Sequence, residues 1–316
     1  MKNLLKFLKF SKYVDFTRKY PRIQNLTKLN NKFLRLILIK FYSYFVKKNK
    51  RLNYFFFNKS QEIQNINFDL NNVSLSNAKL LESLSSNGIV ILGNVLNISE
   101  IENINKFFNE IEQKKIISDW LNNEIIDASS VKYGNENKNV KISFLRKDTK
   151  DLPGLNKLIK VITKQIFGNS ISTSAEFFIH DCKDKEQNNI YEDTNFHIDR
   201  YLPCLKIIYS PNEITSADAP FGYIKKTHKL NNKYMNKFVL NSENFVIQDN
   251  KIPQNLKKDT VEIKCPSNSL IITFTNGFHK RNIFSQEGRV RKTIFFQFTE
   301  NFNTFSLFNF KKFNCL

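Results

Sequence analysis

The chain has 316 residues, long enough to bury a sizeable core in one large domain or two small ones. Its net charge of +20 is concentrated at one end, because residues 1–60 contain 16 Lys or Arg and a single acid, Asp15, whereas the other 256 residues contain 33 basic and 28 acidic side chains. A basic arm alone is a weak electrostatic signal, so this distribution argues against a nucleic-acid-binding function.

The basic N-terminal region lacks the features of a signal peptide or a membrane span. Lys6 and Lys9 interrupt the apolar run of residues 1–10, which a secretory signal does not tolerate. The most apolar stretch, residues 33–46, is too short to cross a bilayer and contains charged residues. We therefore expect a cytoplasmic protein.

Composition divides the chain into a basic, aromatic-rich helical extension over residues 1–60 and a main domain over residues 61–316. Basic residues alternating with Leu, Phe and Tyr suit an amphipathic helix on an anionic membrane surface, which would give peripheral membrane contact. The favoured interpretation is that helices of this region pack on the main domain and present a Lys-rich outer face.

The four cysteines show no spacing typical of a metal site: Cys182, Cys204, Cys265 and Cys315. They fit reduced thiols in a cytoplasm better than a disulfide framework.

Helices and one short strand are predicted before the middle of the chain. Leu residues at helical spacing predict a helix over residues 76–86 that stops at Asn87-Gly88 and leads into a buried strand over residues 89–92. Ser99 to Glu102 matches a capping box, which predicts a helix beginning at Ser99. A further helix is predicted over residues 155–166.

Strand-like sequence follows, and it contains the first candidate ligands. Residues 177–180 predict a strand with His180 at its end, where a structural role is the simplest interpretation. In Asn195 to Arg200, alternation along a strand would place His197 and Asp199 on one face. An imidazole and a carboxylate, with one further His, make the facial triad that holds a non-haem Fe(II).

The third ligand is expected 82 residues after His197. A strand over residues 269–275 is followed by an Asn-Gly turn and by His279, which we expect to complete the triad. The last strand opens on Arg289 and Arg291, which share one face. Arg291 lies deeper, so we expect its guanidinium to bind a carboxylate cosubstrate, with Arg289 as the alternative.

Together these motifs resemble, over residues 87–298, the phytanoyl-CoA dioxygenase-like family of Fe(II)/2-oxoglutarate oxygenases. The resemblance rests on Phe196-His197-Ile198-Asp199, Ala219-Pro220-Phe221-Gly222-Tyr223, Thr227-His228-Lys229-Leu230, and Phe278-His279 with a trailing Arg.

The resemblance implies a mainly β fold with flanking helices, a double-stranded β-helix of the cupin-like jelly-roll type. It implies Fe(II), 2-oxoglutarate and O2 as cofactors, with His197, Asp199 and His279 as ligands and Arg291 on the distal carboxylate of 2-oxoglutarate. The implied reaction hydroxylates an unactivated C–H of a small organic or carrier-linked substrate and releases succinate and CO2. The alternative is a non-catalytic binding or scaffold protein of the same fold.

The sequence departs from the family at two turns. Lys226 and Asn268 stand where the family usually has Gly. Asn tolerates a left-handed turn, so the departure at Asn268 is mild. Lys226 gives no prediction for the conformation of its local turn. His228 is structural in the family, and we therefore place it outside the triad.

Overall fold

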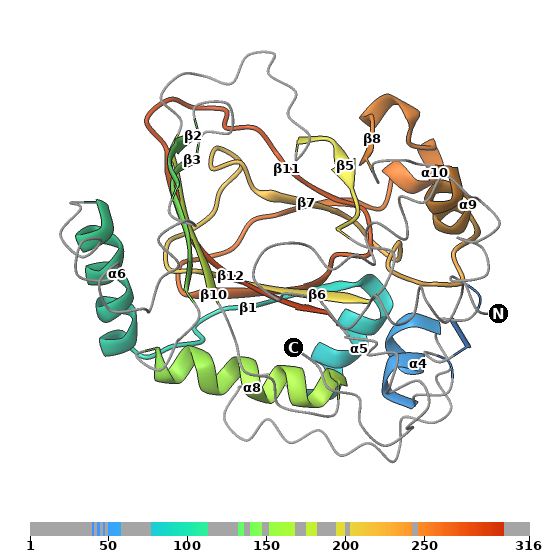
Figure 1. Cartoon of the computed structure of the whole chain (residues 1–316), viewed down its shortest axis with the longest axis horizontal. Helices are drawn as coiled ribbons and strands as arrows, with labels where there is room; N and C mark the ends of the chain where they lie inside the picture. The colour runs from blue at the N-terminus through green and yellow to red at the C-terminus, as the bar shows by residue number, and fades with distance from the viewer. Residues whose placement is uncertain are drawn as a thin grey trace, which may run out of the picture.

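The structure is a computed structural model of the chain. It describes residues 40, 43, 44, 47, 50–57, 77–112, 132–135, 140–146, 152–167, 175–181, 194–199, 203–241 and 246–299. Two antiparallel β-sheets face each other and make the body of the molecule (Figure 1).

The larger sheet has seven strands in the order β1-β10-β6-β12-β4-β3-β2. Their bounds are β1 Ile89–Leu92, β2 Lys132–Asn135, β3 Val140–Arg146, β4 Ala175–Asp181, β6 Cys204–Ser210, β10 Ser269–Phe274 and β12 Val290–Thr299. The second sheet has five strands in the order β8-β5-β11-β7-β9. Their bounds are β5 Phe196–His197, β7 Phe221–Ile224, β8 Val246–Ile247, β9 Thr260–Ile263 and β11 His279–Arg281.

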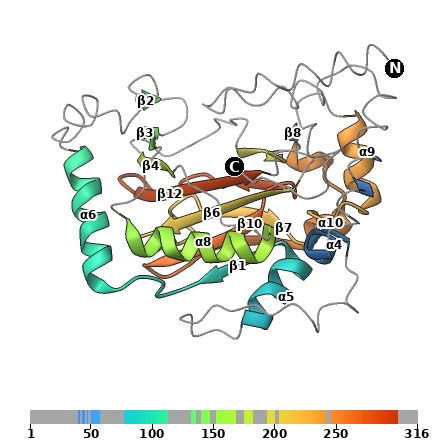
Figure 2. The same cartoon turned by 60° about the horizontal axis from the view of Figure 1, so that its bottom comes forward.

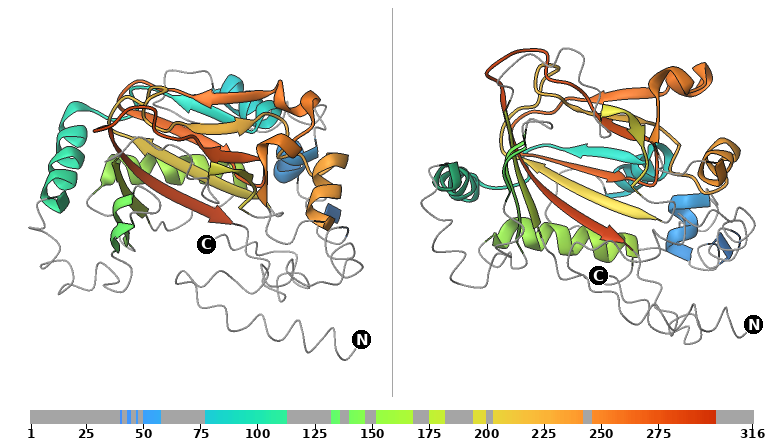
Figure 3. Two further views of the ribbon diagram at one scale, coloured as in Figure 1. Left: turned by 90° about the horizontal axis from the view of Figure 1, so that it is seen from above. Right: turned by 45° about the horizontal axis from the view of Figure 1, so that its top comes forward.

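The chain crosses between the two sheets as it runs from β5 to β6 to β7, and again from β9 through β10 and β11 to β12. This alternation is that of a jelly roll, and the views of Figure 3 show the two layers of strands. The predicted fold, a mainly β double-stranded β-helix with flanking helices, is confirmed.

Helices cover the outer face of the seven-stranded sheet. They are α4 Lys50–Phe57, α5 Asn77–Asn87, α6 Ile98–Glu112 and α8 Pro153–Phe167, while α9 Lys233–Asn241, the 3-10 turn Asp249–Lys251 and α10 Gln254–Lys257 precede β9. Figure 2 shows α8 lying in front of the strands of this sheet. Alternation along β6 explains the contact, because Leu205 and Ile207 belong to the helix-facing core whereas Ile208 packs between the sheets.

The N-terminal extension contributes at least one element to this core. Phe55 and Phe56 of α4 are fully buried, and the Phe56 ring lies 4.7 Å from the Phe274 ring of β10. For α4, the structure therefore has the packed arrangement that the sequence favoured. No helix among the described residues has both the length and the apolar character to cross a bilayer.

Most predicted elements are present, with one correction at a helix start. Asn97, not Ser99, caps α6: its Oδ1 accepts the N–H of Glu100 at 2.9 Å, and the Asn97 N–H donates to the Glu100 carboxylate at 3.4 Å. The capping box therefore begins two residues earlier than predicted, because Ser99 donates its hydroxyl to Asn97 Oδ1 at 2.8 Å instead of capping.

The glycine stop after α5 is present as predicted. Gly88 has φ +83°, and its N–H donates to the carbonyl of Leu84 at 2.8 Å, the arrangement of a left-handed helix C-terminus.

Candidate metal site

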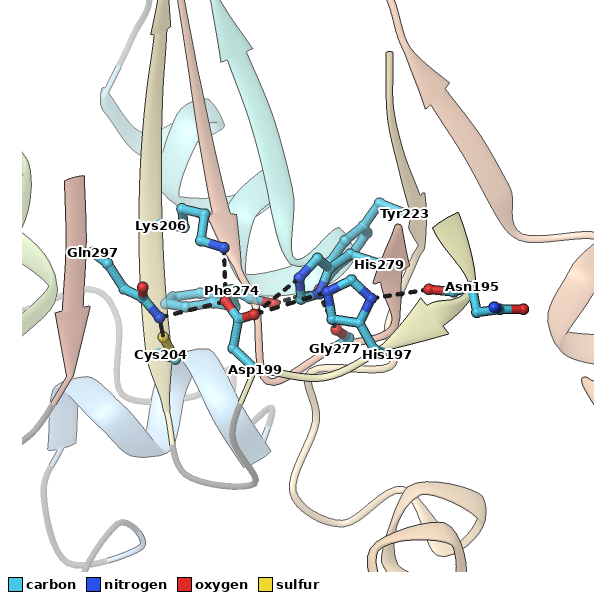
Figure 4. A network of polar contacts seen from close by, with 10 residues as sticks. All are labelled: Asn195, His197, Asp199, Cys204, Lys206, Tyr223, Phe274, Gly277, His279 and Gln297. Carbon is cyan, nitrogen blue, oxygen red and sulfur yellow. Dashed lines mark hydrogen bonds and ion pairs between the residues drawn. The ribbon is translucent and has the colours of Figure 1, made fainter. Parts of the chain in front are cut away.

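Two neighbouring strands of the smaller sheet bring the two predicted histidine ligands together. His197 of β5 and His279 of β11 are directly paired across the strands, so their side chains leave the sheet on the same face. Their ring centroids are 4.3 Å apart (Figure 4).

Asp199 joins the pair from just beyond the strand. β5 ends at His197, so the predicted single strand is shorter than expected, and the position of Asp199 is fixed instead by its N–H, which donates to the carbonyl of Thr275 at 2.9 Å. Asp199 Oδ1 lies 3.4 Å from Nε2 of His279 and 4.0 Å from Nε2 of His197. One ligand atom from each of the three residues lies within 4.8 Å of the others.

The orientation of both imidazoles is set by backbone carbonyls. Nδ1 of His197 lies 2.9 Å from the carbonyl oxygen of Asn195, and Nδ1 of His279 lies 3.0 Å from that of Gly277. A carbonyl can only accept, so each Nδ1 carries the proton and each Nε2 presents a lone pair. Backbone acceptors fix the tautomer of metal-binding histidines in the same way.

The His279 Nε2 atom gives a direct indication that the cluster fits a cation. It is buried, and it makes no hydrogen bond to any residue that the structure describes. A buried polar atom without a partner is costly, and a metal ion between it and Asp199 would satisfy it.

Electrostatics favours the protonation states that a metal requires. Burial, followed by the neighbouring His279, lowers the pKa of His197 to about 4, so this ring is neutral at neutral pH. Burial acts to raise the pKa of Asp199, but Lys206 and the two histidines outweigh it and hold that pKa well below its ordinary value. Two imidazoles and one carboxylate on one face are the donor set of a non-haem Fe(II) centre with open positions.

The side chains of Lys206 and Gln297 also lie against Asp199, and the sequence did not predict these two contacts. Lys206 Nζ lies 2.8 Å from Asp199 Oδ2, and Gln297 Nε2 lies 3.5 Å from the same oxygen. The only signal in the sequence was a single lysine within the apolar run Leu205 to Tyr209 of a predicted barrel strand.

The two candidate arginines have different surroundings. Arg289 is 40% exposed, and its Nε and Nη2 donate to the two carboxylate oxygens of Asp218 at 2.7 and 2.8 Å. Burial acts to raise the pKa of Asp218, but hydrogen bonds from Arg289 and Thr215 lower it below its ordinary value.

Arg291 is buried on the inner face of β12, opposite His180 of β4. Its Nη1 donates to the backbone carbonyl of Ala219, a residue with φ +50°, and more weakly to that of Asp218. Burial first, and then the positive charges of Arg291 and Arg281, lower the pKa of His180 well below its ordinary value. His180 is therefore a neutral neighbour of Arg291.

His228 takes no part in the candidate metal site. Its buried ring stacks on Phe274 with centroids 5.5 Å apart, and Nε2 lies 3.0 Å from the carbonyl oxygen of Ser85. Arg200, the last residue of the predicted motif, lies outside the described residues.

Comparison with known proteins gives structural matches only. The sequence matches no family model and no curated protein. The fold is similar to that of EctD from S. alaskensis with 2-oxoglutarate and 5-hydroxyectoine (TM-score 0.46, 14% identity, 72% of this chain and 77% of that one). It is also similar to HygX from Streptomyces hygroscopicus with nickel and 2-oxoglutarate bound (TM-score 0.42, 14% identity, 72% and 89%). A third similar structure is the epimerase SnoN in complex with Fe3+, alpha ketoglutarate and nogalamycin RO (TM-score 0.46, 12% identity, 70% and 82%).

Proposed function

We propose that this chain is an Fe(II)- and 2-oxoglutarate-dependent dioxygenase that hydroxylates an unactivated C–H of a small organic or carrier-linked substrate. The observation that carries the proposal is the convergence of His197 Nε2, His279 Nε2 and Asp199 Oδ1, with both Nδ1 protons committed to backbone carbonyls. The resemblance of the sequence motifs to the phytanoyl-CoA dioxygenase-like family points to the same chemistry.

In this proposal His197, Asp199 and His279 bind Fe(II) on one face and leave the opposite positions open to the cosubstrate and O2. Bound iron, with 2-oxoglutarate and O2, supplies the oxidising chemistry, and succinate and CO2 are released. The chain itself orients the reactants and excludes water. The presence of Asp199 favours hydroxylation, because halogenating relatives have a small residue there.

Arg291 is the proposed partner of the distal carboxylate of 2-oxoglutarate. It is buried, and its backbone contacts to Ala219 and Asp218 use Nη1, which fixes the plane of the guanidinium. A fixed guanidinium can grip a carboxylate through two N–H donors. Arg289 is the weaker candidate, because its fork already binds the Asp218 carboxylate.

The first test is the visible spectrum of the protein under anaerobic conditions, first with Fe(II) and then with 2-oxoglutarate. We expect a charge-transfer band that requires both additions and is absent in His197→Ala and Asp199→Ala. Loss of two charge-assisted hydrogen bonds should weaken 2-oxoglutarate binding about 100-fold in Arg291→Gln. The matched variant Arg289→Gln should bind 2-oxoglutarate like the unmodified protein.

A well-folded protein without the band would contradict the proposal and favour the non-catalytic binding or scaffold alternative. Weaker cosubstrate binding in Arg289→Gln than in Arg291→Gln would exchange the roles of the two arginines.

Peripheral contact of residues 1–60 with an anionic membrane is a separate proposal, based on their charge. Liposome sedimentation should compare the full chain with a chain that begins at residue 38. That truncation keeps α4, whose Phe55 and Phe56 belong to the core. Equal sedimentation of both proteins with anionic vesicles would exclude residues 1–37 as the contact.

A further inference from the structure

The two oxygens of the Asp199 carboxylate have different partners. Oδ1 faces the two imidazole Nε2 atoms, at 3.4 and 4.0 Å. Oδ2 faces away from them, toward the Lys206 ammonium at 2.8 Å and the Gln297 amide at 3.5 Å (Figure 4). One oxygen is thus available to a metal ion while the other is held by the protein.

Lys206 reaches this position from the opposite sheet. It lies on β6, paired with Thr273 of β10 on one side and Gln297 of β12 on the other, so all three side chains share the inner face of the seven-stranded sheet. The Lys206 side chain is only 14% exposed, and its ammonium also lies 5.8 Å from the centre of the Phe295 ring. A lysine is rarely buried this far without a specific partner, and here the partner is the candidate metal ligand.

This placement has opposite consequences for a cation and for an anion. The ammonium repels a divalent metal ion at the adjacent carboxylate oxygen, because both are positive and the site is shielded from water. It attracts a carboxylate that approaches the loaded metal, for the same reason. The Lys206 ammonium also keeps Oδ2 hydrogen-bonded. Asp199 is thereby limited to one metal-ligating oxygen, which leaves more coordination positions on the metal ion open.

Resting on the function proposed above, we infer that Lys206 is a positioning residue of the metal site. It holds Asp199 as a one-oxygen ligand and makes the metal-loaded site a receptor for a dianionic cosubstrate, at the expense of affinity for the metal itself.

The test uses the full chain and two binding measurements that do not depend on turnover. The affinity for Mn(II) is measured from the electron paramagnetic resonance signal of the unbound ion. The affinity of the Mn(II)-loaded protein for 2-oxoglutarate is measured by calorimetry. Lys206→Met removes the charge and keeps much of the side-chain volume, whereas Lys206→Arg keeps the charge.

In Lys206→Met we expect Mn(II) to bind about ten-fold more tightly and 2-oxoglutarate about ten-fold more weakly. Lys206→Arg should retain most of the 2-oxoglutarate affinity. The matched control is Lys292→Met on β12, because Lys292 Nζ donates to Asn109 of α6 on the other face of the same sheet. It removes one positive charge from the molecule and should change neither affinity.

A purely structural role of Lys206 would not change the affinities for Mn(II) and 2-oxoglutarate in opposite directions. A packing defect in Lys206→Met would weaken the binding of both Mn(II) and 2-oxoglutarate, and that result would overturn the inference. Two unchanged affinities would overturn it as well. If the unmodified protein binds neither Mn(II) nor 2-oxoglutarate, the proposed function and this inference both fail. If it binds both and Lys206→Met behaves identically, only this inference fails.

Discussion

At the scale of single residues, Lys226 and Asn268 are two of the four non-glycine residues in the described part of the chain that have a left-handed backbone. Lys226 has φ +68° and Asn268 has φ +56°. This conformation costs a residue with a Cβ roughly 1–2 kcal/mol, less for Asn, and it persists only where something offsets the cost. The two residues differ in what their side chains provide.

Asn268 is held by a hydrogen-bond network, whereas the side chain of Lys226 is exposed. The Asn268 amide donates to the carbonyl of Leu96 at 2.8 Å, and its Oδ1 accepts the N–H of Leu96 at 3.1 Å and the hydroxyl of Tyr209 at 3.3 Å. At Lys226 the turn is held through the backbone, whose N–H donates to the carbonyl of Asn87 at 3.0 Å.

Glycine at these two positions should therefore act in opposite directions. Lys226→Gly relieves backbone strain and should raise the free energy of unfolding by about 0.5–1 kcal/mol. Asn268→Gly relieves less strain and loses three side-chain hydrogen bonds in a buried region, so it should lower that free energy by about 2 kcal/mol. Urea denaturation of both variants checks the prediction, and destabilisation by Lys226→Gly would show that its side chain contributes more than its exposure suggests.

The scale of elements shows which features local sequence can predict. The stop at Gly88 and the turn before His279 depend on residues a few positions apart, and both are present, whereas the strand expected to carry Asp199 beside His197 ends at His197. The contacts of Lys206 depend on the register of β6 against β10 and β12, more than 60 positions away along the chain, which no local pattern encodes.

The prediction of the start of α6 was wrong for a different reason. Both Asn97 to Glu100 and Ser99 to Glu102 have the residue types of a capping box, and only the folded backbone selects between them.

The connection between β10 and β11 positions His279, and glycine is required there for space. A Cβ on Gly277 would lie 2.3 Å from the Tyr223 hydroxyl and 3.0 Å from the backbone nitrogen of His228. The Tyr223 hydroxyl is itself fixed, since it donates to the carbonyl of Phe274 at 3.0 Å. The carbonyl of Gly277 in turn orients the His279 ring.

Gly277→Ala should therefore disturb the fold and the candidate metal site together. We expect a loss of about 2–3 kcal/mol in the free energy of unfolding, because the backbone must shift to accept the methyl group. Mn(II) binding should weaken as well. The control is Gly93→Ala, where the nearest atom to a new Cβ would be 3.7 Å away. Equal behaviour of the two variants in denaturation and metal titration would contradict the argument.

At the scale of the whole molecule, the end of α4 is joined to the barrel by a buried lysine. Lys229 Nζ donates to the carbonyl of Phe55 at 2.7 Å, and the N–H of Leu230 donates to that of Phe56 at 3.1 Å. These contacts satisfy carbonyls in the last turn of the helix, which have no partners within it. Burial lowers the pKa of Lys229 to about 7.

This shift makes the stability of the whole molecule depend on pH in a defined direction. The ordinary pKa of a lysine, 10.5, applies to the unfolded chain, so between pH 7 and 10.5 the unfolded state binds more protons at Lys229 than the folded state does. The contribution of Lys229 to stability therefore rises with pH across this window, and it is lost as the pH falls back toward 7. Below pH 7 both states are protonated and the contribution no longer changes.

The prediction concerns the difference between the unmodified protein and Lys229→Met, measured by urea denaturation from pH 7 to pH 9.5. Relative to the variant, the unmodified protein should gain roughly 1 kcal/mol of unfolding free energy for each pH unit. Above about pH 10 tyrosines act in the opposite direction, because burial raises the pKa of Tyr209 and Tyr223 and the unfolded state then loses protons first. The tyrosines are present in both proteins, so their effect cancels in the difference. A difference that stays constant with pH would mean that Lys229 remains charged in the folded protein, held by the helix carbonyls throughout.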